Sequence, residues 1–246
     1  MMKVYAVSCK TPQTKKELDD ILSSVPDESG SLVCFPEYFL CMEKPDDLLA
    51  ECQIFAANKQ IYLALGMLDQ IKLCSSLQSN RYLTGILIDK SGKIIGRQQK
   101  LNPTSFEIKD YKICKGVSKD IISAEFGTVE IAMCKDQWYF RQIKSDSKID
   151  AEIVLHLRGF GLNDPKFGNF YDNWLMLDRT TAMLSKAYLI GTTGADKNAP
   201  LSDIIDFEGN ILAESDSEGI ITASIDLEQL RKYRSKEFAS TIVPRF

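Results

Sequence analysis

The sequence has a single histidine, His156, and none of the usual motifs that bind metals or nucleotides. Serine–histidine and cysteine–histidine triads need an imidazole base, and zinc sites usually take several histidines or cysteines. His156 stands inside the apolar run 153–160, where we interpret it as a hydrogen-bonded strand residue. No GxGxxG follows a strand, and neither GxxxxGKS nor GxxxxGKT occurs. We therefore expect no metal and no organic cofactor, and a carboxylate as any general base.

Long hydrophobic runs and an excess of basic residues are also missing. The apolar runs are too short to span a bilayer, and the first residues, MMKVYAVSCKTPQ, turn polar too early for a signal peptide. The 30 basic residues against 34 acidic ones give a formal net charge of -4, which argues against a nucleic-acid partner. The seven cysteines form no CxxC pair and are odd in number, which argues against a disulfide framework. We expect a cytoplasmic protein with reduced thiols that binds neither membranes nor nucleic acid.

Strand and helix patterns alternate along all 246 residues, with no linker, low-complexity tract or obvious repeat. The chain is 44% hydrophobic, enough for one sizeable core. Strands mixed with helices and hairpins predict a single layered α/β domain over residues 1–246. We predict strands at 2–9, 31–37, 61–68, 127–134, 151–159, 187–194 and 218–227, hairpins at 81–100 and 202–214, and helices at 14–25, 44–60, 135–146, 173–187 and 228–237.

Three chemically active side chains stand where an apolar or β-type run stops: Glu37 in LVCFPE, Lys100 in IIGRQQK and Cys134 in VEIAMC. Loops at strand ends are where α/β proteins gather functional groups. Taken singly, they read as a surface acid, a solvated lysine and an inert core thiol. Together they supply a carboxylate base, a cation and a thiol nucleophile, which suffice for acyl transfer without histidine.

The segment after Cys134 sets an expectation for the thiol. A helix that begins there points partial positive charge at the sulfur, and Lys100 adds to it, so we expect a lowered pKa for Cys134. Asp136, in the first turn of that helix, suits the helix dipole, and we interpret it as structural rather than catalytic.

The segments LVCFPEYFL, GRQQKLNP and GTVEIAMCKDQW resemble the Glu, Lys and Cys motifs of the nitrilase, or carbon-nitrogen hydrolase, superfamily. The hairpin at 81–100, the helix and strand at 178–196 and the closing elements at 202–234 are similar to that family as well. The resemblance thus covers nearly the whole chain. It implies a four-layer αββα sandwich and a homodimer or higher homo-oligomer packed through helices.

The resemblance also implies a role for each matching residue. Glu37 takes the thiol proton, Cys134 attacks the amide carbon, and Lys100 with the backbone N–H of Lys135 stabilises the oxyanion, at ~2.7–4 kcal/mol per donor. Glu107, in the loop after Lys100, is nearest to the family's further glutamate and is expected to orient substrate and Lys100. The alternative for Glu107 is a solvated loop acid.

The chain departs from the family pattern in two places. Residues 134–141 read CKDQWYFR, without the family's Pro-Glu pair, and residues 182–185 read AMLS where Ala-x-Glu-Asn is common. These departures keep a non-catalytic nitrilase-fold binding or scaffold protein as an alternative. Retention of all three motif residues favours an enzyme, because a scaffold has no evident need for them.

The substrate is less constrained, because pocket walls come from loops that differ within one fold. We expect a small linear amide that releases ammonia, with an N-carbamoyl amine or a nitrile as alternatives. Residues 136–138 resemble N-carbamoylputrescine amidases, which is the hint toward the N-carbamoyl amine. Trp138, Trp174 and Arg158 are candidate substrate contacts, with packing as the alternative for each, and loop 159–172 is expected to shape the pocket. Two further alternatives would use the same thioester chemistry. One is acyl transfer to an amine or lipid, and the other is an ammonia-supplying glutaminase domain.

Overall fold

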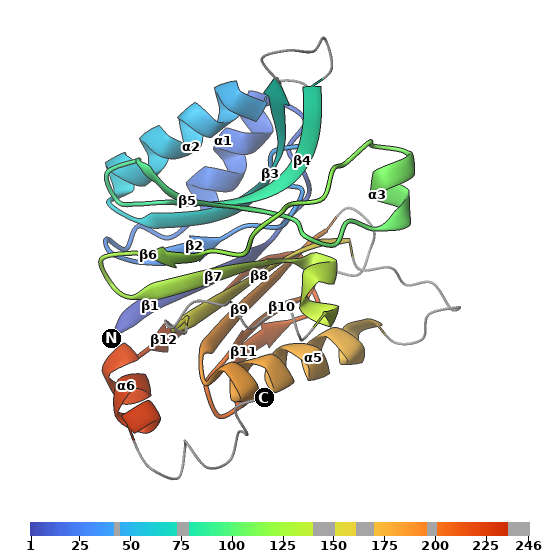
Figure 1. The fold of residues 1–246 in the computed structure, drawn as a ribbon. Helices are drawn as coiled ribbons and strands as arrows, with labels where there is room; N and C mark the ends of the chain where they lie inside the picture. The colour runs from blue at the N-terminus through green and yellow to red at the C-terminus, as the bar shows by residue number, and fades with distance from the viewer. Residues whose placement is uncertain (42–44, 73–78, 140–150, 161–169, 196–200, 236–246) are drawn as a thin grey trace.

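The computed structural model describes residues 1–41, 45–72, 79–139, 151–160, 170–195 and 201–235. In these segments two six-stranded sheets lie face to face with helices on their outer sides (Figure 1). This arrangement confirms the predicted four-layer αββα sandwich. No helix in the described segments is long and apolar enough to cross a membrane. None of the six cysteines in these segments forms a disulfide.

Each sheet has a parallel centre and antiparallel edges. The parallel strands of the first sheet are β1 (Met2–Ser8), β2 (Leu32–Cys34) and β3 (Tyr62–Lys72). Those of the second sheet are β7 (Thr128–Met133), β8 (Ile153–Phe160) and β9 (Tyr188–Gly194). The first sheet runs in the order β12 (Gly219–Ile225), β1 (Met2–Ser8), β2 (Leu32–Cys34), β3 (Tyr62–Lys72), β4 (Ser79–Ile88) and β5 (Ile94–Gln99). The second runs in the order β11 (Ile211–Ser215), β10 (Ser202–Ile205), β9 (Tyr188–Gly194), β8 (Ile153–Phe160), β7 (Thr128–Met133) and β6 (Ile121–Ser123).

This topology brings the three predicted strand ends together. Glu37 follows β2 and Cys134 follows β7, each at the carboxyl end of a parallel strand. Strand β5 is antiparallel to β4, which is antiparallel to β3, so β5 points the same way as β3 and delivers Lys100 to the same edge. Glu37 and Lys100 thus come from the first sheet, whereas Cys134 comes from the second.

The helices form the outer layers. Helices α1 (Lys15–Ser24) and α2 (Pro45–Lys59) cover the first sheet, and α5 (Phe170–Ser185) covers the second (Figure 1). Apolar residues of these helices, such as Leu18, Leu48 and Ala182, belong to the buried clusters. The side chain of Thr14 accepts a hydrogen bond from Glu17 N and so fixes the start of α1. The helices are α1 (Lys15–Ser24), α2 (Pro45–Lys59), α3 (Ser105–Lys109), α5 (Phe170–Ser185) and α6 (Leu227–Ser235), and the 3-10 helix is η1 (Cys134–Trp138).

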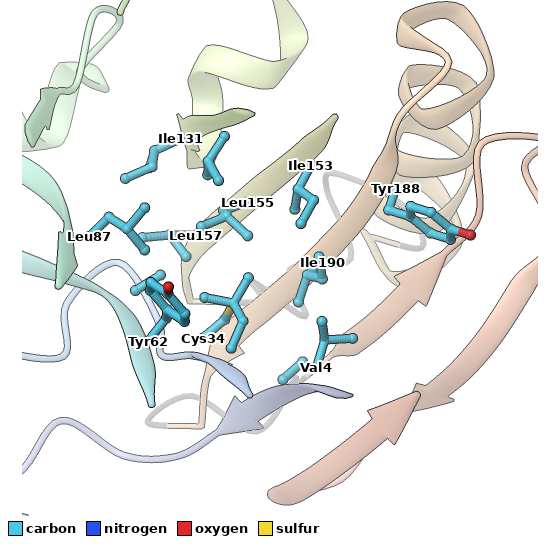
Figure 2. Close-up of a cluster of buried hydrophobic side chains, with 14 of the residues drawn as sticks. Val4, Cys34, Tyr62, Leu87, Ile131, Ile153, Leu155, Leu157, Tyr188 and Ile190 are labelled. Carbon is cyan, nitrogen blue, oxygen red and sulfur yellow. The ribbon is translucent and has the colours of Figure 1, made fainter. Parts of the chain in front are cut away.

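The main core lies between the two sheets. Successive residues of a strand point to opposite faces, so Leu155 of β8 faces the first sheet while His156 and Arg158 face α5. Figure 2 shows Val4 and Cys34 of the first sheet meeting Ile190 and Leu155 of the second. Fully burying a side chain of this kind contributes ~1.5–3 kcal/mol, which holds the sheets face to face.

The structure differs from the predicted elements near the site. The helix predicted at 135–146 is wrong in its described part, which is the short 3-10 helix η1; residues 140–146 lie outside the described segments. The predicted polar loop after Lys100 contains α3, and β6 was not predicted. Both elements are too short for a periodic pattern to show. Of the loop expected at 159–172, residues 161–169 also lie outside the described segments.

Candidate active site

A buried lysine lies between two buried glutamates. Lys100 Nζ is 2.7 Å from Glu37 Oε1 and 2.7 Å from Glu107 Oε1. None of the three residues is more than 2% exposed. Because an isolated charge is very unfavourable away from water, each of these groups depends on its partners for its charge.

Backbone hydrogen bonds fix this group on both sheets. Lys100 N donates to Leu83 O at 2.8 Å, which extends the β4–β5 ladder by one residue. Glu37 N donates to Arg158 O at 3.1 Å, which ties the end of β2 to β8 in the other sheet. The position of Glu37 is therefore set by contact between the two sheets.

Glu107 is held by its own short helix. The side chain of Thr104 accepts from Glu107 N, and Glu107 Oε2 accepts from Thr104 N at 2.6 Å, which forms a capping box. The other carboxylate oxygen accepts from the hydroxyl of Tyr38 and from Lys100. Glu107 is thus a buried partner of Lys100, rather than a solvated loop acid. Tyr38 was not among the predicted site residues, and its only signal in the sequence is its position directly after Glu37.

Cys134 stands at the junction of β7 and η1 with a positive φ of 46°, which is uncommon for a residue other than glycine. Its sulfur accepts a hydrogen bond from the backbone of Gly159. A Cβ on residue 159 would lie 2.4 Å from Tyr38 Cε2 and 2.8 Å from Glu37 Oε2, so glycine permits this close packing. Gly159 therefore donates to the thiol sulfur and leaves the space that Tyr38 and the Glu37 side chain occupy.

The thiol carries its proton in this environment. Burial and the Glu37 carboxylate raise the pKa of Cys134 to about 12, although Lys100 and the Gly159 backbone act in the opposite direction. The expectation of a lowered thiol pKa is therefore wrong, because loss of solvent outweighs the positive groups and η1 is a single short turn. Any reaction at this sulfur would consequently need a base to remove the thiol proton.

Glu37 has the properties of such a base. Burial raises the pKa of Glu37 to about 7, although Lys100 lowers it, and the charge of Glu107 adds to the rise. A general base works best when its pKa lies near the operating pH. Burial alone lowers the pKa of Lys100, but Glu37, Cys134 and Glu107 outweigh it and raise that pKa above its ordinary value. Lys100 hence remains a cation.

Asp136 connects η1, which begins at Cys134, to the backbone that follows Lys100. Its carboxylate accepts from Leu101 N at 3.0 Å and from Asn102 N at 2.6 Å. Burial raises the pKa of Asp136, whereas these backbone bonds lower it. The residue therefore fixes the backbone directly after Lys100, in agreement with its interpretation as structural.

Arg158 lies in a buried ionic cluster under α5. Its Nη1 donates to Asp178 Oδ2 at 2.7 Å and to Asp203 Oδ2 at 2.9 Å, and its Nη2 donates to Leu201 O at 3.1 Å. The expected pairing of Arg158 with a substrate carboxylate does not fit this arrangement, because two carboxylates of the protein already hold the guanidinium. Asp178 and Asp203 were not among the predicted site residues, although a buried arginine requires such counter-charges.

The remaining expected residues lie around the same end of the second sheet. Lys135 follows Cys134 in η1. Trp138 is 46% exposed and its ring lies 5.3 Å from that of Trp174, which is 5% exposed. The Trp174 ring lies 5.1 Å from the ring of His156, whose two nitrogens are both hydrogen-bonded as expected. Trp138 is the more accessible of the two tryptophans to a ligand.

A separate cavity of about 1140 Å³ opens beside the chain that follows Glu37. Cys41 joins the cavity wall to that segment, but Lys100 and Cys134 are not part of the described wall. We therefore assign it no role in the reaction. It is lined by Gln13, Thr14, Lys15, Cys41, Asp47, Leu48, Glu51, Leu68, Gln70 and Arg81.

Several solved structures share the fold of this chain. The chain is similar to a carbon-nitrogen hydrolase from Helicobacter pylori G27, with a TM-score of 0.79 and 18% identity over 95% of this chain and 92% of that chain. It is also similar to Saccharomyces cerevisiae Nit3, a member of branch 10 of the nitrilase superfamily, with a TM-score of 0.73 and 18% identity over 96% of each chain. A mutant amidase from Nesterenkonia sp. AN1, with acrylamide added at its active-site cysteine, matches with a TM-score of 0.71 and 13% identity over 96% of this chain and 97% of that chain.

The sequence itself identifies the family. The model of the carbon-nitrogen hydrolase family matches residues 7–235, so the chain belongs to that family and is a carbon-nitrogen hydrolase. No curated protein sequence matches the chain. The solved structures add a shared fold, and the family adds the class of enzyme.

Proposed function

We propose that this enzyme hydrolyses the carbon–nitrogen bond of a small linear amide through a thioester on Cys134 and releases ammonia. One observation carries the proposal: a buried lysine bridges two buried glutamates and interacts electrostatically with Cys134. Such a group is unfavourable in a protein that only binds, because burial of charges usually lowers stability relative to apolar packing. Its retention therefore favours catalysis over a scaffold role.

In the first half-reaction, Glu37 takes the proton of the Cys134 thiol as the sulfur attacks the amide carbon. The carbonyl oxygen becomes an oxyanion, which Lys100 and the backbone N–H of Lys135 stabilise. Protonated Glu37 then gives its proton to the amide nitrogen, the carbon–nitrogen bond breaks, and ammonia leaves. The acyl group remains on Cys134 as a thioester.

In the second half-reaction, Glu37 takes a proton from water, and the resulting hydroxide attacks the thioester carbon. The oxyanion forms again in the same place and collapses with loss of the Cys134 sulfur, which regains its proton from Glu37. A carboxylic acid leaves. A single carboxylate with a pKa of about 7 suits both proton transfers, since it is half ionised near neutral pH.

Glu107 holds Lys100 in this scheme. Its two carboxylate oxygens bind the Lys100 ammonium, the Tyr38 hydroxyl and the Thr104 backbone. The arrangement keeps the ammonium charged and directed into the site. The half-exposed Trp138 and its neighbour Trp174 are the side chains we assign to the wall that meets substrate.

The proposal is tested by intact-protein mass spectrometry with wild type and Cys134→Ala, incubated with linear amides, N-carbamoyl amines and nitriles while ammonia is measured. We expect an acyl adduct and ammonia from a linear amide with wild type only. If only N-carbamoyl amines or nitriles give a signal, the proposed substrate class is wrong, but the proposal of a covalent intermediate on Cys134 stands. Acrylamide, which adds to the active-site cysteine of the mutant Nesterenkonia amidase, serves as a thiol probe.

An inert Cys134 would support the alternative of a non-catalytic relative. If neither the substrates nor acrylamide modify Cys134, while the protein retains its folded circular dichroism spectrum, the thioester proposal is wrong. Cys134→Ala supplies the background from the other thiols, of which Cys41 and Cys114 are partly accessible. Glu37→Gln is expected to fold and to lose turnover.

We further propose that residues 1–246 form one domain, that the protein is cytoplasmic, and that it assembles as a homodimer or higher homo-oligomer. Exposed methionines on the outer side of α5, Met176 and Met183, support assembly through that helix. Light scattering on the purified protein, with Met176→Glu as the disrupting variant, measures the assembly. A monomeric wild type would contradict it.

A further inference from the structure

The one histidine of the chain lies directly behind the nucleophile. His156 is fully buried on the face of β8 that packs against α5. Its Nε2 lies 3.1 Å from the carbonyl oxygen of Cys134, and its Nδ1 lies 2.7 Å from Asp178 Oδ1. The ring thus bridges the backbone of the proposed nucleophile and a carboxylate of the covering helix.

The partners of the ring fix its protons. A carbonyl oxygen only accepts hydrogen bonds, so the hydrogen of this contact belongs to His156 Nε2. The 2.7 Å contact between His156 Nδ1 and Asp178 Oδ1 is a hydrogen bond, so a second proton lies between them, on the nitrogen or on the oxygen. The imidazole therefore donates to Cys134 O, while Asp178 sets the orientation of the ring.

Asp178 is itself held from the far side. Arg158 Nη1 binds Asp178 Oδ2 at 2.7 Å and Asp203 Oδ2 at 2.9 Å. A Cβ on residue 191 would lie 2.4 Å from Asp203 Oδ1 and 2.6 Å from Arg158 Nη2, so Gly191 leaves the space that this cluster occupies. The positive charge of Arg158 and the proton between His156 and Asp178 offset the negative charge of the two carboxylates. The cluster is therefore compatible with burial. A continuous series of hydrogen bonds leads from β10 to the Cys134 carbonyl.

The carbonyl of Cys134 and the N–H of Lys135 are two ends of one planar peptide unit. A donor on the oxygen fixes the orientation of that plane, and it also polarises the N–H at the opposite end. The positive φ of Cys134 is uncommon for its residue type, so local preference alone does not hold the plane in place. An outside contact is needed, and His156 is the side chain that supplies one.

We propose that His156 is a positioning residue that orients and polarises the Cys134–Lys135 peptide, and thereby prepares the Lys135 N–H to stabilise the oxyanion. The inference rests on the proposed function, since it assigns a task within that thioester chemistry. It makes His156 neither the base nor a substrate contact. Asp178 and Arg158 support the ring from behind.

Two reactions of the same thiol separate this role from a general structural one. Acylation of Cys134 by p-nitrophenyl acetate passes through a tetrahedral oxyanion and releases nitrophenolate. Alkylation by iodoacetamide displaces iodide at a saturated carbon and forms no oxyanion. Both rates are measured in single turnover on wild type, His156→Asn and His156→Gln, with Cys134→Ala as the background.

His156→Asn keeps a polar group near Asp178 but is too short to reach Cys134 O, whereas the longer amide of His156→Gln can replace Nε2 as the donor. We expect acylation to fall by ~10–100-fold in His156→Asn, up to the loss seen when an oxyanion donor is removed. Alkylation is expected to stay close to the wild-type rate, and His156→Gln to recover most of the acylation. If His156→Asn does not fold, Asp178→Asn is expected to slow acylation and spare alkylation.

Three results would overturn the inference: equal loss of both rates, wild-type acylation in His156→Asn, or no recovery in His156→Gln. A wild type whose Cys134 reacts with neither reagent would instead disprove the thioester chemistry, and the inference with it. If the wild type is acylated but the variants give any of these three results, the role of His156 is disproved and the thioester chemistry stands.

Discussion

The carboxylate of Asp136 accepts a hydrogen bond from the backbone N–H of Asn102 at 2.6 Å and thereby joins two parts of the site that arise on different sheets. Asn102 follows Lys100 at the end of the first sheet, and Asp136 follows Cys134 at the end of the second. The distance between the proposed nucleophile and the proposed oxyanion cation therefore depends on a residue that takes no part in the chemistry.

Asp136→Asn tests this connection. The amide replaces one accepting oxygen with a donor, so at least one of the bonds to Leu101 N and Asn102 N is lost. We expect the free energy of unfolding to fall by ~1.5–3 kcal/mol, the range for a hydrogen bond to a charged group, and kcat to fall with it. Urea denaturation measures the first. Asp69→Asn, which breaks a partly exposed pair with Arg97, is the control and should stay within about 1 kcal/mol.

The pH dependence of acylation follows from Glu37. Its pKa of about 7 means that the carboxyl group is protonated below pH 7 and accepts the thiol proton only above it. The rate should therefore rise with pH to a plateau, with a midpoint near 7 and a roughly tenfold loss one pH unit below. Single-turnover acylation measured from about pH 5 to about pH 9 tests this profile. A midpoint near the ordinary value for glutamate would contradict the assignment.

Glu107→Gln should move that midpoint downward. The negative charge of Glu107 raises the pKa of Glu37, and its removal also leaves Lys100 to pair with Glu37 alone. Both changes favour the ionised form of Glu37. The plateau rate should fall at the same time, because Lys100 loses its second anchor. A pH profile of this variant distinguishes the two effects, and an upward shift would show that Glu107 does not act on Glu37 as described.

Arg158→Met should be strongly destabilising. It leaves Asp178 and Asp203 facing each other in the buried layer without their shared cation. Removing one member of a buried ion pair costs about 3–5 kcal/mol of stability. Lys59→Met, which breaks the exposed pair with Asp27, should change stability by less than about 1 kcal/mol. Equal effects in the two variants would show that the buried cluster is no stronger than a surface pair.

Much of the fold was predictable from alternation along the strands. Ile153, Leu155 and Leu157 occupy every second position of β8 and all face the first sheet. The strand ends at Glu37, Lys100 and Cys134 could also be predicted, because each closes an apolar or β-type run. Local pattern sufficed here because side-chain direction in a strand depends on the backbone alone.

The environment of those residues was not predictable from local pattern. The pKa of Cys134 depends on burial by chain segments far away in sequence, so the expectation from a neighbouring helix had the wrong sign. The partners of Arg158 lie 20 and 45 residues away, on α5 and β10. A rule that buried arginines need counter-charges predicts that partners exist, but only the packing of α5 on the sheet identifies them.

The division of the site between two sheets makes the chemistry conditional on complete folding. A chain with only one sheet formed would have either the base and the cation or the thiol, but not all three. A half-folded molecule that had only the second sheet would carry the thiol without the base that takes its proton and without the cation that stabilises the oxyanion, so it would be inert toward amides. Hydrolytic activity would then report directly on docking of the two sheets. Substitutions in the core between them, such as Leu155→Ala, would reduce turnover before they unfold the protein.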